Sequence, residues 1–323
     1  MMPSARLLLL CLLLLCLTGC GVTEGMKNQK IQNDLVMAQQ SATLGKTAEA
    51  RQWADRAIAV APNDVSVYAP NPDADHGSVA EVFLAVGDDA TAVSYLNVAA
   101  RKFPQSDRPL PLLVQAQTRL GDTANARANA KTLAGLLEAR LARPGVYPSA
   151  ALLDELAQAY FDSGDAGKGA ATYRRVIATY PFNPQTDDAR NGLAYSYAVA
   201  NDKAHLSEAL TLSLQALKAA QEGVKQGKVS DVNLGAVQDT VGWVQYRLGD
   251  YPAALSNLQQ AMNADPREAE NRYHLGMTYQ KLGQTEAARA ELSRAVLLSA
   301  GYAEAAAALS ALPAPAPAQA GNV

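Results

Sequence analysis

Residues that could carry out chemistry are few in this sequence, and they do not combine into a catalytic set. The run Gly45-Lys46-Thr47 looks like the end of a phosphate-binding loop, but Gln40 stands where the first glycine is required and no strand precedes it. The three histidines, His76, His205 and His274, have no second histidine or cysteine three or four residues away to act as a metal ligand. We therefore expect a protein with no cofactor, no metal and no enzymatic activity.

One thiol has chemistry of another kind. All three cysteines lie in the first twenty residues, where an apolar run of 11 residues, Leu7 to Leu17, follows Arg6. This run is too short to cross a bilayer, which needs about 20 apolar residues, and it has the layout of a secretory signal. It ends in Leu17-Thr18-Gly19-Cys20, which resembles the lipobox of bacterial lipoproteins. In that motif, the thiol of the cysteine is the nucleophile that receives the lipid.

The lipobox resemblance implies a signal peptide over residues 1–19, lipid such as palmitate on Cys20, and a polar tether over residues 20–30. Gly21 stands where an aspartate would be expected for inner-membrane retention, which implies the periplasmic face of the bacterial outer membrane. The alternative is an ordinary signal peptide or a short helical anchor in which Cys20 has no role. Removal of the signal peptide would remove Arg6 and leave 27 cationic and 31 acidic side chains. The charge balance therefore does not favour nucleic acid as a partner.

The rest of the chain reads as an all-helical protein built from repeats. Hydrophobic residues make up 49% of the sequence and charged residues 18%, which indicates a folded chain. Aromatic residues are only 6%, so strand formers are scarce. An internal period of 34 residues relates one set of small and apolar positions to a second set. The first set is Gly242, Gly249, Ala254, Leu258 and Ala261, and the second is Gly276, Gly283, Ala288, Leu292 and Ala295.

Each of these positions has a physical purpose in a pair of packed helices. Two helices approach closely only where small residues face each other, as Gly242 and Ala254 would. Gly249 fits the left-handed position that ends the first helix, and Pro266 stops the second. Such a hairpin has two apolar faces, so it must stack on others. The period and these positions resemble the tetratricopeptide repeat (TPR) family.

Weaker matches extend the same register upstream and give about seven repeats, with unit starts near residues 31, 73, 107, 150, 187, 235 and 269. The repeat from residue 107 has Glu138 where proline is expected, so its second helix should continue to about Arg143. A helix from Tyr302 to Leu312 should cap the last repeat. We therefore expect a TPR solenoid over residues 31–312 and an extended Pro- and Ala-rich tail over residues 313–323.

The TPR resemblance implies that partners bind in a concave groove lined by the first helix of each repeat. Aromatic and arginine side chains in such a groove would supply most of the binding energy. An alternative for Trp243 is a structural role in the core, since a register error of one residue turns each side chain inward. Acidic pairs such as Asp187-Asp188 are assigned to helix capping. The groove residues expected by register are Phe161, Tyr195, Asp239, Trp243, Tyr246, Arg247, Tyr273 and Lys281.

Together these features predict a non-enzymatic, lipid-anchored scaffold of the bacterial cell envelope that binds a protein or an extended peptide. The alternative is a component of exopolysaccharide synthesis or export whose groove aromatics stack on sugar rings. The residue pattern does not identify the partner, and it does not choose between secretion, envelope assembly and polysaccharide export.

Overall fold

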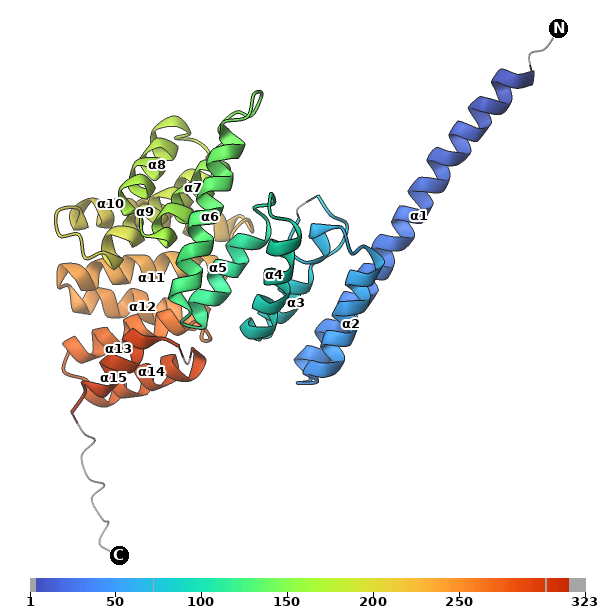
Figure 1. Cartoon of the computed structure of the whole chain (residues 1–323). Coiled ribbons are helices and arrows are strands. Elements are labelled where there is room, and N and C mark those ends of the chain that lie inside the picture. The colour runs from blue at the N-terminus through green and yellow to red at the C-terminus, as the bar shows by residue number, and fades with distance from the viewer. Residues whose placement is uncertain (1–3, 72, 300, 314–323) are drawn as a thin grey trace, which may run out of the picture. The chain divides into compact units, whose positions relative to one another are not determined.

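The computed structural model describes residues 4–71, 73–299 and 301–313, with side chains from residue 23 onward. The chain divides into two compact units, Met1–Gln117 and Thr118–Val323, whereas the sequence predicts a single solenoid over residues 31–312. All the regular elements in the described residues are helices (Figure 1). In these residues, six pairs of helices that adjoin in the sequence pack against each other as hairpins, which confirms the all-α repeat fold predicted from the 34-residue period.

The first unit begins with the long helix α1. Its elements are α1 (Ser4–Thr43), α2 (Thr47–Val60), the short 3-10 helix η1 (Val65–Val67), α3 (Val79–Ala85), α4 (Asp89–Lys102) and α5 (Pro109–Arg119), whose last two residues belong to the second unit. Gly45-Lys46 forms the turn between α1 and α2, so the phosphate-loop-like run is a helix–helix connection as expected.

The second unit contains the strongest repeats. Its helices are α6 (Thr123–Leu141), α7 (Ala150–Ser163), α8 (Ala166–Thr179), α9 (Gln185–Val199), α10 (Leu206–Lys225), α11 (Asp231–Leu248), α12 (Tyr251–Ala264), α13 (Ala269–Lys281), α14 (Thr285–Leu298) and α15 (Ala303–Ser310). Helix α6 is the extended helix predicted from Glu138. Helix α15 packs on α14 in the place predicted for the capping helix.

The turns inside the hairpins have a common chemistry. Gly249 adopts φ +88° and ends α11 in the left-handed conformation, as the sequence predicts. The next residue, Asp250, accepts a hydrogen bond at 3.2 Å from the backbone N–H of Ala253 and so caps α12. The same Gly-Asp arrangement ends one helix and caps the next at Gly164-Asp165. A glycine and an aspartate therefore set the sharp reversal between helices.

The helices of a hairpin touch where the sequence supplies small residues. A Cβ atom added to Gly242 would lie 2.6 Å from Leu258 Cγ and 3.2 Å from the Ala254 carbonyl oxygen. A Cβ on Gly276 would lie 2.8 Å from Leu292 Cγ. Ala254 is fully buried. The predicted register is thus confirmed at its tightest contacts.

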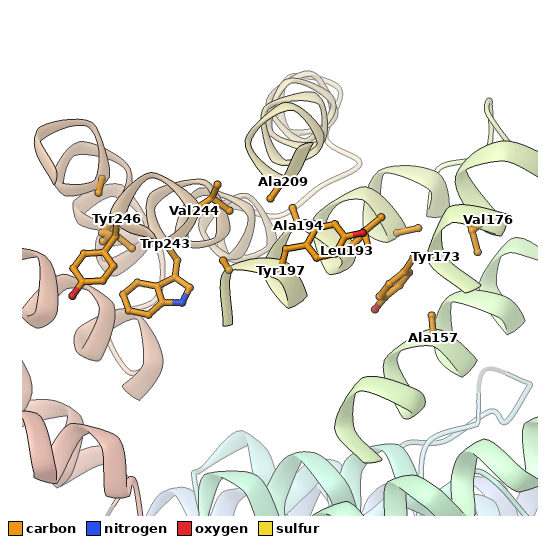
Figure 2. Packing of buried hydrophobic residues seen from close by; sticks show 14 of the residues in the cluster. Ala157, Tyr173, Val176, Leu193, Ala194, Tyr197, Ala209, Trp243, Val244 and Tyr246 are labelled. Carbon is orange, nitrogen blue, oxygen red and sulfur yellow. The ribbon is translucent and has the colours of Figure 1, made fainter. Parts of the chain in front are cut away.

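Successive hairpins of the second unit also pack through their first helices, because α7 contacts α9, α9 contacts α11, and α11 contacts α13. Buried side chains from these helices and from α8, α10 and α12 form one continuous core, part of which is drawn in Figure 2. Tyr173 reaches from α8 towards α9, where a Cβ on Gly192 would lie 2.5 Å from its hydroxyl. Glycine at position 192 therefore leaves room for a buried tyrosine between two repeats.

The C-terminal part of the second unit contacts the N-terminal part of the same unit. The Ser299 hydroxyl donates a hydrogen bond to the Arg119 carbonyl oxygen. Two glycines permit the approach, since a Cβ on Gly301 would lie 2.1 Å from the Leu120 carbonyl oxygen and one on Gly121 would lie 2.4 Å from the Gly301 carbonyl oxygen. The sequence does not predict this contact, because neither glycine lies in the strong repeats.

The N-terminal region is helical where the sequence predicts two separate segments. Helix α1 runs without interruption from Ser4 to Thr43 and includes the stretch 20–30 that was expected to be a tether. The side chain of Cys20 and the tail residues 314–323 lie outside what the structure describes. Within the described residues, no helix combines the length and apolar character needed to span a membrane.

Candidate partner-binding face

In each hairpin of the second unit, we call the earlier helix the first helix and the later helix the second helix. The name first-helix face is used for the surface formed by side chains of the first helices α7, α9, α11 and α13 that point away from the second helices α8, α10, α12 and α14. The sequence predicts exposed aromatic anchors there, and this expectation is wrong for two of them. Trp243 is only 2% exposed and Tyr246 only 8%. Both lie on α11 within the buried core (Figure 2). The structural alternative for Trp243 is therefore correct.

Trp243 is buried because the next repeat covers it. Its ring stacks on His274 from α13 with ring centroids 3.9 Å apart, and on Tyr246 at 4.6 Å. The Arg247 guanidinium lies 4.4 Å from the centre of the indole ring, a cation–π arrangement. The sequence places Trp243 correctly on the side of α11 that faces other first helices. It does not show that α13 packs against that side.

Asp239 was predicted to line the groove, but it is 5% exposed and pairs with His274. Its Oδ2 atom lies 2.8 Å from His274 Nδ1. Burial lowers the pKa of His274, but the carboxylates of Asp239 and Glu270 together outweigh burial and leave that pKa raised. The histidine that looks isolated in sequence therefore has a carboxylate partner 35 residues away.

Tyr195 connects two repeats across the same region. Its hydroxyl donates a hydrogen bond to Glu270, a residue that the repeat register did not predict for the groove. Burial, and secondarily the Glu270 carboxylate, raises the pKa of Tyr195 well above its ordinary value. Burial also raises the pKa of Glu270, while His274 opposes that shift. Tyr195 thus links α9 to α13 through a hydrogen bond.

The other predicted residues are divided between this cluster and the ends of the face. Tyr273 is half-buried, with its ring 5.9 Å from that of Trp243 and 5.1 Å from that of Tyr302. Phe161 is half-buried against Gly169 and Tyr173, and Lys281 is exposed at the end of α13. The structure therefore brings Tyr195, Asp239, Trp243, Tyr246, Arg247 and Tyr273 together, and leaves Phe161 and Lys281 outside that cluster.

Three carboxylates on α7 and α9 form a second feature of the face. Burial raises the pKa of Asp154 to about 7, and the negative charges of Asp188 and Glu155 add to the shift. Asp162 and Asp188 are exposed to water, yet desolvation by the surrounding protein is the main cause that raises the pKa of each.

The hydrogen bonds around these carboxylates are incomplete. Gln158 donates to Asp162 at 2.8 Å and accepts from the Tyr173 hydroxyl at 2.9 Å. Among the described residues, Asp154 Oδ1 and Asn191 Oδ1 are buried oxygens without a hydrogen-bond donor. A buried acceptor without a donor costs roughly 1–3 kcal/mol, so the isolated chain does not fully satisfy this region.

The carboxylate of Asp154 should make the stability of the protein depend on pH. A folded pKa of about 7, above the unfolded value of 3.8, means that the carboxylate lowers stability as pH rises from about 4 to about 7. We expect Asp154→Asn to raise the free energy of unfolding at pH 8 by about 2–3 kcal/mol, with allowance for screening by water. At pH 4 the gain should vanish. Urea unfolding at the two pH values measures it, and a gain that does not depend on pH would contradict the assignment.

The histidines show no metal site. His76 Nδ1 lies 2.8 Å from the Gly77 carbonyl oxygen, and His205 Nδ1 lies 2.7 Å from Asp202 Oδ2. In the part of the chain that the structure describes, His, Cys, Asp and Glu side chains form no group of three or more that could hold a metal ion. The polar side chains of the second unit instead serve packing and the first-helix face.

The fold defines a class of protein, the α-solenoid built from stacked helical repeats. Family models of the tetratricopeptide repeat match residues 151–183 and 246–312. The chain therefore contains tetratricopeptide repeats. The predicted family is therefore confirmed, and the matches include the α7–α8 hairpin and the strong C-terminal repeats.

Comparison with known proteins agrees with this assignment. A segment of 178 residues is 33% identical to the cellulose synthase operon protein C of Pseudomonas fluorescens (strain SBW25), and it covers 54% of this chain but only 13% of that relative. A tetratricopeptide repeat protein from Parabacteroides merdae ATCC 43184 superposes with a TM-score of 0.52 at 11% identity. That match covers 87% of this chain and 98% of the other, and it shows the fold alone.

Proposed function

We propose that this protein is a non-enzymatic scaffold that binds a partner protein on its first-helix face. One observation carries the proposal. Four consecutive first helices pack side by side in the second unit. A rigid surface of this kind binds without paying the entropy of ordering itself, which favours recognition of an extended segment. The TPR fold supports the general role in protein interaction.

The proposed interaction can be tested by site-specific photo-crosslinking in cells. A photo-reactive amino acid would replace Lys281, which is exposed on the first-helix face, or Lys218, which is exposed on the second helix α10. We expect a discrete crosslinked partner from position 281 and none from position 218. Equal crosslinking from both positions would contradict a binding role for this face.

We also propose that the scaffold is anchored to the cell envelope through lipid on Cys20. The apolar run Leu7 to Leu17 and the sequence Leu17-Thr18-Gly19-Cys20 support this. Gly21 supports placement at the periplasmic face of the outer membrane. Two or more acyl chains would hold the protein firmly, because each buried methylene contributes about 0.8 kcal/mol.

The anchoring proposal predicts the behaviour of a single variant. Cys20→Ser removes the thiol that would form the thioether, so the protein should move from the membrane fraction to the soluble fraction after cell disruption. Cys16→Ser, a matched change four residues earlier in the apolar run, should leave the protein with the membrane. Membrane retention of Cys20→Ser would end the lipid-anchor proposal and leave the scaffold proposal intact.

A second candidate function is a role in exopolysaccharide synthesis or export with direct contact to glycan. The similarity to a cellulose synthase operon protein favours it. Burial of Trp243 removes one stacking platform, so Tyr273 and Phe161, both half-buried, would have to contact sugar rings. Cellohexaose binding by the full chain, with loss in Tyr273→Ala, would support this candidate. Binding of a protein partner without affinity for the oligosaccharide would support the scaffold alone.

A further inference from the structure

Arg247, in the last turn of α11, is a half-buried cation that has neither an ion pair nor a hydrogen bond within the described residues. Its Nε atom is buried without an acceptor, whereas its two Nη atoms reach solvent. A half-buried guanidinium without a counter-ion is costly, so an anion from outside the chain would stabilise it. In the part of the second unit that the structure describes, every other half-buried arginine has a carboxylate partner: Arg119 pairs with Glu268, Arg190 with Asp187, Arg272 with Glu291 and Arg289 with Glu286.

Aromatic packing holds the Arg247 guanidinium in place. It lies over the Trp243 ring, 4.4 Å from the ring centre, and Figure 2 shows Trp243 beside Tyr246 in the buried core. A guanidinium that lies over an aromatic ring keeps its edge free. Because the two Nη atoms reach solvent, that edge can donate two parallel hydrogen bonds to one carboxylate.

Two tyrosine hydroxyls lie close to the same guanidinium. Burial raises the pKa of Tyr246 and of Tyr273, and the positive charge of Arg247 opposes the rise in each. Among the residues that the structure describes, neither hydroxyl has a hydrogen-bond partner, and neither oxygen is closed to solvent. Side chains from α11 and α13 therefore supply three groups that can donate hydrogen bonds to one anion.

The carboxylates of the buried cluster do not neutralise Arg247, because they have other partners. Asp239 pairs with His274, and Glu270 accepts a hydrogen bond from the Tyr195 hydroxyl. The anion that would satisfy Arg247 must then come from a bound molecule.

We propose that Arg247, together with the Tyr246 and Tyr273 hydroxyls, binds one carboxylate of an extended segment of the partner protein, on a side chain or at its C-terminus. This inference rests on the proposed scaffold function and names a chemical group that the partner must carry. An acidic polysaccharide also carries carboxylates, but it repeats them along the chain. Asp162 and Asp188, exposed on the same face, would repel such a polyanion. A single carboxylate matches a single unpaired cation.

The test uses the full chain in non-ionic detergent and an array of octapeptides attached through their N-termini. The fourth residue is glutamate or glutamine among varied uncharged residues, and each peptide ends in a free carboxylate or an amide. We expect at least tenfold stronger binding to peptides with one carboxylate than to amidated glutamine peptides. Comparison of the two kinds of carboxylate shows which one the site binds.

Three variants and a matched control assign the binding to this site. Arg247→Gln should reduce binding of the carboxylate peptides to the level of the neutral peptides. Arg247→Lys keeps the charge but not the paired donors, and Tyr273→Phe keeps the ring but not the hydroxyl, so each should weaken binding at least threefold. These two variants decide the matter if Arg247→Gln does not fold. Arg175→Gln removes the same charge from an exposed position of the second helix α8 and should change binding by less than twofold.

Several results would overturn the inference. They are equal losses in Arg247→Gln and Arg175→Gln, full binding in both Arg247→Lys and Tyr273→Phe, and no preference for carboxylate peptides, including no binding to any peptide. Tighter binding of hexagalacturonate than of any peptide would replace the peptide with an acidic glycan. A partner crosslinked from position 281 as strongly in Arg247→Gln as in the parent would overturn the inference while the scaffold function stands.

Discussion

Ala254→Glu is expected to lower the free energy of unfolding by about 3–5 kcal/mol, because it buries a charge without a partner. Ala254 is fully buried where α12 crosses α11, and the backbone at this point closely approaches Gly242. A longer side chain cannot turn to solvent without separating the two helices. Chemical denaturation followed by circular dichroism gives the free energy directly.

The control for Ala254→Glu lies two residues along the same helix. Ser256→Glu introduces the same side chain at an exposed position of α12 and should change stability by about 0.5 kcal/mol or less. If Ala254→Glu unfolded at the same denaturant concentration as Ser256→Glu, the register that places Ala254 between two helices would be wrong.

Asp239→Ala is expected to cost about 3–5 kcal/mol at pH 6, because it removes one member of a buried ion pair and leaves the other without a partner. His274 is buried, and the pKa raised by the nearby carboxylates keeps it protonated in the folded protein. The contribution of this group is fully present below its unfolded pKa of about 6.5 and is lost as pH rises through the raised folded pKa. The cost of Asp239→Ala should therefore decrease as the pH is raised.

A double-mutant cycle isolates the pair from the packing around it. His274→Gln alone should also destabilise the protein, and Asp239→Ala in that background should cost less and show weaker pH dependence. Equal costs of Asp239→Ala with and without His274, at every pH, would show that the aspartate acts through packing alone.

The fold could be predicted from the sequence because its tightest contacts depend on residue size. Glycine and alanine recur where helices touch, as at Gly242 and Ala254, and no larger residue fits there. The glycines at the ends of the first helices can also be predicted from the sequence, since Gly249 and Gly283 adopt the left-handed αL conformation, which other residues avoid. The closing contact at Gly121 and Gly301 could not be predicted, because it joins segments 180 residues apart without a shared pattern.

The candidate site was predictable only in part. The repeat register put Trp243 and Asp239 on the correct side of α11, but exposure depends on how the next hairpin is rotated. In the structure α13 brings His274 over Trp243 and next to Asp239, so both become core. Asp188 was assigned to helix capping, because it reads as an ordinary residue of a helix's first turn. Its charge acts on Asp154 of the preceding repeat, which sequence spacing alone does not show.

The measurement that most directly tests the central claim is hydrogen exchange of the full chain with and without the partner captured from position 281. Exchange reports local opening of backbone hydrogen bonds, so a bound partner slows it where it contacts the protein. We predict that added protection falls on the first helices α7, α9, α11 and α13. Protection confined to the second helices α8, α10, α12 and α14 would contradict a binding role for the first-helix face.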